Sequence, residues 1–424
     1  MRLSDHGETM SAVSGIRRIL ADIASATGPN SMGWLNLGAG NPAQIPGVLR
    51  MWMDLTHNAV DSDFATLSAA YGPSRGTDTL VEAITEYFAS RYGWPISPEN
   101  VLVGPGAQLL AFAATTVFTG RTGGEQRSLV LPSMPDYTGY HGLRLEAEGV
   151  VGIPPRIVAL SNNRFRYEVD VAAVRKQRSM GAMLLSNPRN PTGGSLTQYE
   201  LDALIAVAEE REVPLIVDNA YGAPFPGVAG TDVVPAWNSQ VVNCFTFSKA
   251  GIPGERVGFV IGSAEIIAPM SSFVSNTVLH ASQLIQSTTA TALRDRHLDR
   301  VVDLELRPHY LHKRAFAEQI LRDVLGDEFT WYLHVSDGGM FCWLWIDEQW
   351  FRCSALYDIL KLLKVCIVPG DSFFIMDAVT PELGRHAEQC VRLSLSADTH
   401  TISAGVSRIG EALRRMRSDF ERPA

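Results

Sequence analysis

Short apolar runs alternate with amphipathic helical stretches through the middle of the chain. Several runs are apolar at every position, which is typical of strands covered on both faces of a mostly parallel sheet. The predicted strands are residues 101–103, 129–131, 183–185, 215–217, 242–247 and 257–261. Helices are predicted between them, at 108–118 after a Gly-Pro-Gly turn and at 198–212, where Thr197 is a candidate N-cap. This alternation predicts a doubly wound α/β domain.

The pattern changes near Leu284. A long helical region, broken near Pro308, leads into a strand-rich part and a final helix at 402–417. The predicted strands there are 329–334, 339–346, 365–368 and 391–394. We therefore predict a large α/β domain at 48–298 and a smaller α+β domain. The smaller domain is formed by 299–424 together with 1–47, a segment without a predicted strand that we expect to pack against it.

Composition narrows the class of protein. The net charge of −9 disfavours nucleic-acid binding, which depends on clustered Lys and Arg. No apolar run approaches the roughly 20 residues that a membrane span needs, and Asp5 and Glu8 are untypical of a signal peptide. The 5 cysteines have irregular spacing without C-x-x-C, which disfavours disulfides or a metal site. We expect a cytoplasmic protein without a membrane, nucleic-acid or metal partner.

Lys249 follows an apolar strand and is followed by a loop rich in glycine and proline. Partial desolvation there lowers the pKa of a lysine and makes its amine a nucleophile toward an aldehyde. Arg256 and the hydroxyls of Thr246 and Ser248 could bind a phosphate. The alternatives are a surface lysine beside a solvated arginine, and a serine that only caps a helix.

Asp218 ends another apolar strand, where a buried carboxylate is costly without a cationic partner. A protonated pyridine nitrogen is such a partner, and the pairing strengthens a pyridine ring as an electron sink. Tyr221, three residues later, could donate a hydrogen bond to a phenolic oxygen on that ring. The alternative is that Asp218 caps the next helix.

Two loops add to this picture. The segment NPRNPTG at 187–193 is a rigid, non-helical loop that could aim Asn190 into the cleft where open α/β sheets bind ligands, or could be a structural turn. The turn at 104–106 opens a helix whose free N–H groups attract phosphate. Leu109 stands at the third glycine position of G-x-G-x-x-G, which disfavours a nicotinamide dehydrogenase.

These segments, in this order, resemble the fold-type I aminotransferases that depend on pyridoxal 5′-phosphate (PLP). The resemblance covers nearly the whole chain. LGAGNPAQIP at 37–46, DNAYGAPFPG at 218–227 and GMFCWLW at 339–345 look like the valine–pyruvate aminotransferase branch. The resemblance implies a large domain with a mostly parallel, doubly wound sheet and a smaller α+β domain.

The resemblance implies catalytic roles for Lys249, Asp218 and Tyr221. Lys249 matches the lysine that holds PLP as a Schiff base and moves the substrate proton, and Asp218 matches the partner of the pyridine nitrogen. Tyr221 and Asn190 match the pair that bonds the phenolic oxygen. Tyr137 matches the aromatic residue that stacks on the ring, although it could also pack in the core.

Further cofactor and substrate residues follow from the same resemblance. The matches to the phosphate-binding residues are Ala107, Gln108, Thr246, Ser248 and Arg256. Tyr71 matches a residue that reaches the cofactor phosphate of a neighbouring subunit, which implies a homodimer with shared active sites. Arg392 matches the arginine that grips the substrate α-carboxylate with a bidentate fork, assisted by Gly38 and Asn190; the alternative for Arg392 is a surface ion pair.

One segment departs from the family pattern. Residues 276–283 read NTVLHASQ, where the family is usually rich in glycine and proline. The resemblance places this segment near the partner subunit's active site. His280 could contact an atypical substrate, but packing at the dimer interface is the favoured interpretation.

The predicted function is amino transfer from a small aliphatic amino acid, such as valine or alanine, to a 2-oxo acid such as pyruvate, by a ping-pong reaction through pyridoxamine phosphate. Tyr137, Phe225 and Trp34 suggest an apolar site for such a donor. The alternative is a PLP enzyme with another reaction or a substrate from specialised metabolism, namely a β-lyase, cyclase or decarboxylase, because these need the same motifs. A non-catalytic PLP sensor would need an additional DNA-binding domain, for which the segment before residue 48 is too short.

Overall fold

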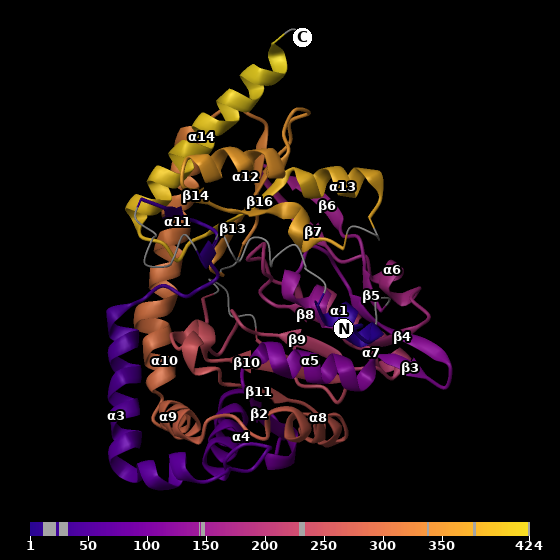
Figure 1. Ribbon diagram of the computed structural model, residues 1–424, viewed down its shortest axis with the longest axis vertical. Helices are drawn as coiled ribbons and strands as arrows, with labels where there is room; N and C mark the ends of the chain where they lie inside the picture. Colours follow the sequence, from indigo (N-terminus) through magenta and orange to yellow (C-terminus); the bar gives the residue numbers. More distant parts are fainter. Residues whose placement is uncertain are drawn as a thin grey trace.

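The computed structural model describes residues 1–11, 23–24, 33–143, 145, 149–228, 234–336, 339–375 and 379–422. Two sheets dominate it, an eight-stranded sheet and a six-stranded sheet. Figure 1 shows the larger sheet in the lower half of the molecule and the smaller one above it, below the C-terminal helix. The predicted α/β fold with a second, smaller sheet is confirmed.

The eight-stranded sheet has the order β2-β11-β10-β9-β8-β4-β3, with β5 beside β4. Pairs β10–β9, β9–β8, β8–β4 and β4–β5 are parallel, so the sheet is mostly parallel. Its strands are β2 (Val101–Gly104), β3 (Gly120–Thr122), β4 (Glu125–Leu131), β5 (Val150–Gly152), β8 (Met180–Ser186), β9 (Leu215–Asp218), β10 (Val241–Thr246) and β11 (Gly258–Ile261). All strands predicted before residue 262 lie in this sheet. Strands β8 to β11 are buried at every position, as their apolar runs indicate.

Helices cover both faces of this sheet. Helix α5 (Ala107–Phe118) starts at the carboxyl end of β2 and packs against α8 (Ala264–Val278). Helix α7 (Gln198–Arg211) begins at Thr197, whose hydroxyl accepts a hydrogen bond from the backbone N–H of Glu200, as the predicted N-cap requires. Helices α3 (Pro46–Ala69), α4 (Asp78–Tyr92) and α9 (Gln283–Arg294) pack together beyond the β2 edge (Figure 1).

The six-stranded sheet has the order β15-β16-β13-β12-β7-β6. Its C-terminal strands are β12 (Trp331–His334), β13 (Phe341–Ile346), β15 (Val368–Pro369) and β16 (Cys390–Ser394), all within predicted strands or overlapping them. The hairpin of β6 (Arg156–Leu160) and β7 (Arg164–Glu168) completes it, because β7 pairs in parallel with β12. This hairpin comes from within 48–298, so the second sheet takes strands from both predicted domain ranges. The division of the chain into those ranges stays a prediction.

The segment before residue 48 does contain a strand, so the expectation that it has none was wrong. Strand β1 (Leu35–Asn36) pairs in parallel with β14 (Val365–Cys366). Two residues are too few to produce a periodic apolar pattern, and the strand exists only because its distant partner lies beside it. Residues 12–22 and 25–32 lie outside the described residues, so packing of the whole segment stays a prediction.

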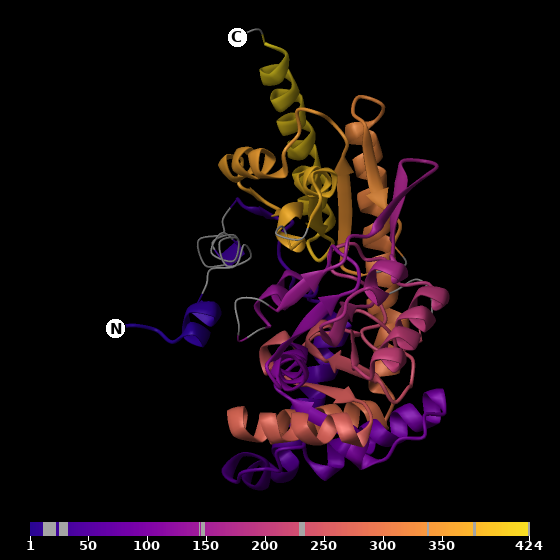
Figure 2. The ribbon, with the colours of Figure 1, turned by 90° about the vertical axis from the view of Figure 1, so that its right-hand side faces the viewer.

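The long helical region is not broken near Pro308, so that prediction was wrong. Helix α10 (His297–Val301) continues into a π-helical turn, Val302–Leu306, and then into α11 (Arg307–Leu325). Pro308 lies in the first turn of α11, where a missing N–H costs little. Figure 2 shows the final helix, α14 (Thr399–Glu421), projecting beyond the six-stranded sheet. Among the described residues, no helix is long and apolar enough to cross a membrane.

Candidate active site

A cavity of about 410 Å³ lies at the carboxyl ends of β8, β9 and β10, between residues of both sheets. This is the position where open α/β sheets bind ligands. Every predicted site residue except Tyr71 lines the cavity. Those residues are Gly38, Ala107, Gln108, Tyr137, Asn190, Asp218, Tyr221, Thr246, Ser248, Lys249, Arg256 and Arg392.

Lys249 lies in a short 3₁₀ turn, Ser248–Ala250, directly after β10. Its Nζ donates a hydrogen bond to the carbonyl oxygen of Gly40 at 2.8 Å and lies 5.9 Å from the centroid of the Tyr221 ring. Burial, assisted by the positive charge of Arg392, lowers the pKa of Lys249 to about 8. A much larger fraction of this amine is therefore neutral at neutral pH than for an exposed lysine, as nucleophilic chemistry requires.

Asp218 is the last residue of β9 and is buried. Its Oδ2 accepts a hydrogen bond from the Tyr140 hydroxyl at 2.7 Å, and its Oδ1 accepts one from the backbone N–H of Ala220 at 3.0 Å. Burial raises the pKa of Asp218, while the hydrogen bonds from Tyr140 and Ala220 oppose that rise. The carboxylate thus offers a negative charge that a cationic ring nitrogen would stabilise.

Tyr140 was not predicted as a site residue from the sequence. The signal was its spacing from Tyr137, because the turn Thr138–Gly142 is a 3₁₀ helix in which residues three apart lie on one side. The two rings are in edge-to-face contact, with centroids 5.2 Å apart. Other residues that line the cavity were also missed, among them Ser186, at the end of β8, and Ala39 and Gly40, in the N-terminal segment.

One end of the cavity is lined with phosphate-binding groups. The Thr246 hydroxyl donates to Ser248 Oγ at 2.9 Å, and Arg256 Nη1 donates to the same oxygen at 3.3 Å. Helix α5 begins beside them at Ala107 and contributes free N–H groups. Gly106, with φ +90°, leaves this cradle open, because a Cβ there would lie 2.6 Å from Arg256 Nη2.

The other end of the cavity contains Arg392, a buried residue of β16. Its Nη1 donates to Asn190 Oδ1 at 2.9 Å and its Nη2 donates to the carbonyl oxygen of Gly38 at 2.7 Å. Its Nε has no hydrogen-bond partner within the described part of the chain. Burial lowers the pKa of Arg392 to about 10, so it remains a cation at neutral pH. A guanidinium with donors to spare, lining a cavity, fits a carboxylate.

The side chains between the two ends suit a flat aromatic ligand. Tyr137 lines the cavity, and Asn190 Nδ2 lies 3.5 Å from the Tyr221 hydroxyl, within reach of a shared acceptor. Burial raises the pKa of Tyr221, which keeps the hydroxyl protonated as a donor. Two residues proposed for an apolar substrate site do not line the cavity, Phe225 and Trp34. Phe225 stacks on Phe247 in the core instead, with centroids 5.1 Å apart.

Tyr71 and His280 lie together outside the cavity. The Tyr71 side chain is 85% exposed, and its ring contacts that of His280 edge-to-face, with centroids 6.0 Å apart. Leu279, with φ 64° and ψ −69°, forms a γ-turn closed by the His280 N–H, which donates to the carbonyl oxygen of Val278 at 2.8 Å. Apart from this ring contact, the Tyr71 side chain is largely uncovered by the described residues of its own chain.

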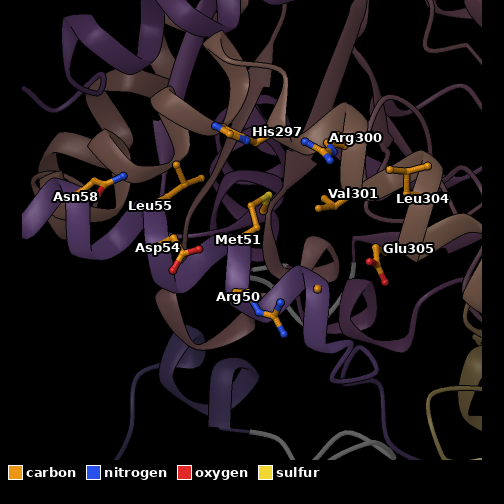
Figure 3. A pocket seen from close by; sticks show the side chains of 11 residues that line it. Arg50, Met51, Asp54, Leu55, Asn58, His297, Arg300, Val301, Leu304 and Glu305 are labelled. Atoms are coloured by element: carbon orange, nitrogen blue, oxygen red, sulfur yellow. The ribbon is translucent and has the colours of Figure 1, made fainter.

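A second pocket, of about 440 Å³, lies between α3 and the helical region 297–305 (Figure 3). Arg50, Asp54, Arg300 and Glu305 surround it, and Met51 lies among them (Figure 3). None of the predicted site residues lines this pocket, and it contains no lysine or buried carboxylate. The chemistry therefore belongs to the first cavity.

The residues of the first cavity fit PLP. The open cradle beside Gly106 matches a phosphate, the buried Asp218 matches a pyridine nitrogen, and the desolvated Lys249 matches an aldehyde. Fold and cavity together define a PLP-dependent transferase. The chain belongs to the family of class I and II aminotransferases, whose model matches residues 33–409.

Relatives with known names extend this result. The chain is 31% identical to the valine–pyruvate aminotransferase of Escherichia coli over 98% of its own length and 99% of that protein. It superposes on the valine–pyruvate aminotransferase of Salmonella typhimurium with a TM-score of 0.85 and 29% identity, covering 96% of this chain and all of that one. A structure from Psychrobacter arcticum, described as an amino-acid aminotransferase, gives a TM-score of 0.93 with 28% identity and covers 99% of this chain. The protein is a PLP-dependent aminotransferase.

Proposed function

We propose that this aminotransferase moves the amino group of a small aliphatic amino acid, of the valine or alanine type, to a 2-oxo acid such as pyruvate. The observation that carries the proposal is the distribution of charge in the cavity. Among the described residues, its cations are Lys249, Arg256 and Arg392, and each has a role in the cofactor or carboxylate site. Of the cavity residues that the structure describes, no cation is left over for an acidic side chain, which favours an uncharged substrate. The full-length similarity to valine–pyruvate aminotransferases supports the same substrate class.

The proposed chemistry assigns one task to each group. When bound, PLP supplies a conjugated ring that takes up the electron pair released at the substrate Cα. Lys249 Nζ accepts the Cα proton in its neutral form and returns it in its charged form, a role suited to a pKa of about 8. Asp218 keeps a positive charge on the ring nitrogen, and Tyr140 holds that carboxylate in place. Arg392 grips the α-carboxylate of both the amino acid and the 2-oxo acid.

Ring and phosphate binding complete the proposed site. Tyr137 would stack on the ring, while Asn190 and Tyr221 would hydrogen-bond its phenolic oxygen. The proposed phosphate-binding residues are Ala107, Gln108, Thr246, Ser248 and Arg256, which lie together at one end of the cavity. Gly38 supports Arg392 through its carbonyl oxygen.

The test is a titration of the PLP-loaded enzyme with a panel of amino acids, followed by visible absorption. L-valine or L-alanine should convert the band of the bound cofactor to that of its aminated form, and pyruvate should restore it. A response to L-aspartate alone would refute the proposed substrate class. Product analysis with a donor–acceptor pair separates amino transfer from β-elimination, cyclisation or decarboxylation.

Substitution of Lys249 tests the proposed catalytic residue. Lys249→Ala should still bind PLP through the phosphate-binding residues but should lose at least about 100-fold in turnover, because the proton carrier is gone. Lys176→Ala is the matched control, since Lys176 is exposed and is not among the residues that line the cavity. Turnover of Lys249→Ala equal to that of the control would refute the assigned role.

We also propose a homodimer in which Tyr71 reaches the cofactor phosphate of the partner subunit. The support is a set of exposed apolar side chains on α3 and near the site, which would otherwise face water. They are Leu49, Met53, Phe64, Tyr71 and Leu279. Met53 also lines a groove that includes Ile252 and Glu255, next to the phosphate end of the cavity. The favoured interpretation of His280, that it packs at a dimer interface, fits this surface.

Hybrid dimers test the shared site. A dimer of one Lys249→Ala subunit and one Tyr71→Ala subunit, isolated with two affinity tags, contains one site with both native residues. It should regain activity that neither homodimer has. A monomer by light scattering, or an inactive hybrid, would refute the shared site. The irregular cysteine spacing favours a cytoplasmic location, which cell fractionation would test.

A further inference from the structure

Asp136 is a fully buried carboxylate beside the cavity, not among the residues that line it. Its Oδ1 accepts hydrogen bonds from the Tyr137 N–H at 2.7 Å and from the Ser186 hydroxyl at 2.5 Å. Its Oδ2 accepts one from the Ser186 N–H at 3.1 Å. A buried anion is tolerated only when its acceptors are satisfied in this way, so these three donors hold Asp136 in one orientation.

Ser186 connects Asp136 to the carboxylate end of the cavity. While its hydroxyl donates to Asp136, its Oγ accepts a hydrogen bond from the backbone N–H of Asn190 at 3.1 Å. Asn190 Oδ1 in turn accepts from Arg392 Nη1 at 2.9 Å. The hydrogen-bonded path therefore runs from Asp136 through Ser186 and Asn190 to the guanidinium.

The backbone of Asp136 makes a second connection to the same place. Its N–H donates to the carbonyl oxygen of Phe373 at 3.2 Å. The Phe373 ring faces the Arg392 guanidinium, with 5.2 Å between the ring centroid and Cζ. Asp136 is thus hydrogen-bonded to Ser186, at the end of β8, and to Phe373, in the 3₁₀ turn Gly370–Phe373. Both segments lead to Arg392 from distant parts of the chain.

We propose that Asp136 is a positioning residue that, through Ser186 and Asn190, holds Arg392 in the geometry that grips the substrate α-carboxylate. The proposal rests on the proposed carboxylate-binding role of Arg392. Asp136 acts without touching substrate or cofactor. The ionised form of Asp136 accepts all three hydrogen bonds. A proton on either carboxylate oxygen would point at an N–H or O–H group that now donates to that oxygen.

The groups that face Asp136 predict where its ionisation changes. Burial raises the pKa of Asp136 to about 7, against the lowering effects of the Ser186 hydroxyl, the Arg189 guanidinium and the two backbone N–H groups. Among the described residues, Tyr140 also faces it, and burial raises the pKa of Tyr140 well above its usual value, so it stays neutral. The path to Arg392 is therefore complete above neutral pH and weakened below it.

A simpler role for Asp136 would be to balance the buried charge of Arg189. Glu200 offers the comparison, because it also faces Arg189 electrostatically and is also buried. Its hydrogen bonds go to Thr197, Val169 and Arg166, and none that the described residues make connects it to Ser186 or Asn190. Removing the charge of Glu200 changes the balance around Arg189 and leaves the path intact.

The experiment measures carboxylate binding separately from turnover. 3-Methylbutanoate, a branched carboxylate without an amino group, is titrated calorimetrically into the PLP-loaded enzyme at pH 6 and pH 8.5. Asp136→Asn and Ser186→Ala should each weaken binding about tenfold at pH 8.5, the effect of one buried hydrogen bond. The deficit of Asp136→Asn relative to wild type should disappear at pH 6, where Asp136 is itself protonated. Glu200→Gln should bind like wild type, and all variants should keep wild-type affinity for PLP.

Two results would overturn the proposal. Wild-type affinity in Ser186→Ala would show that the path through Ser186 does not hold Arg392, and this holds even where Asp136→Asn fails to fold. A deficit of Asp136→Asn that is equal at both pH values would rule out control by its ionisation. A different result would refute the carboxylate-binding role of Arg392 in the proposed function, namely an Arg392→Lys variant that binds 3-methylbutanoate as tightly as wild type. If the wild type binds no 3-methylbutanoate, the aliphatic substrate class is refuted, and pyruvate replaces it in the same comparison.

Discussion

The two ends of the cavity are built in different ways. The phosphate end takes its hydroxyls and its guanidinium from the last residue of β10 and the loop after it, where Thr246 and Arg256 both donate to Ser248 Oγ, and takes its helix N–H groups from the start of α5. At the carboxylate end, Arg392 meets Asn190 and Gly38, which are 202 and 354 residues away in the chain. The phosphate end is thus a local structure of the eight-stranded sheet, while the carboxylate end forms only where the six-stranded sheet and the N-terminal segment meet it.

This difference separates cofactor binding from substrate binding. The phosphate end needs no contact with the six-stranded sheet, so cofactor affinity should respond mainly to changes in the loop after β10 and in the Gly106 turn that packs against Arg256. The carboxylate end depends on contacts between distant segments, so substrate affinity should respond to changes that leave the cofactor untouched. A substitution at one end should therefore leave binding at the other end unchanged.

The largest effect is expected from Arg392→Lys. A lysine cannot donate to Asn190 and Gly38 and still present a fork to the substrate, so kcat/KM should fall about 100-fold. PLP affinity, measured by fluorescence titration, should stay within twofold of wild type. Arg417→Lys is the control, because Arg417 pairs with Glu328 and lies over the Phe329 ring and does not line the cavity. A matching loss of PLP affinity would contradict the separation of the two ends.

Gly106→Ala should act at the opposite end. Its new Cβ would lie 2.6 Å from Arg256 Nη2, and φ at Gly106 is +90°. PLP affinity should fall about tenfold, because the guanidinium must move and the backbone is strained. The KM for the amino acid at saturating PLP should not change. Gly93→Ala is the matched control: Gly93 also has positive φ, at +67°, but its Cβ would meet no atom within 4 Å. Equal PLP affinities in the two variants would contradict a steric role for Gly106.

Tyr140→Phe tests the centre of the cavity through pH. Burial raises the pKa of Asp218 and the Tyr140 hydrogen bond lowers it, so the variant should raise it further. A carboxyl whose folded pKa is raised favours the protonated form. The contribution of Asp218 to the free energy of unfolding is therefore complete at low pH and is lost as the pH rises from about 4 through the folded pKa. Urea unfolding of the apoprotein should show Tyr140→Phe losing about 1 kcal/mol more than wild type over this range. Parallel curves would contradict the prediction, and Tyr332→Phe, on β12, is the control.

The smallest effect is expected at the rim, which belongs to neither end. Leu279 adopts a strained γ-turn, which a glycine would adopt with less strain. Leu279→Gly should raise the free energy of unfolding by about 1 kcal/mol, with kcat/KM within about twofold of wild type. Val278→Gly, in the last helical position before the turn, should destabilise instead. A large change in substrate KM in Leu279→Gly would assign His280 a role in substrate binding rather than packing.

The order of elements and most of the site follow from local sequence. Apolar runs predicted the strands of the large sheet, and polar residues at their carboxyl ends predicted Asn190, Asp218 and Lys249 as neighbours. This works because parallel strands end at one edge, so sequence position fixes spatial position there. Tyr71 was predicted as a residue that acts in a partner subunit, and its exposure leaves that prediction open.

The sequence by itself therefore determined the fold class, the cofactor and the residues that strand ends bring together. Only the tertiary structure decided the placement of the β6–β7 hairpin in the second sheet, the β1–β14 pairing, the bond of Tyr140 to Asp218 and the path from Asp136 to Arg392. The physical reason is the distance along the chain over which each effect acts. Periodicity and turn chemistry act over a few residues, whereas these contacts depend on which distant surfaces meet once the chain has paid the entropy of closing long loops.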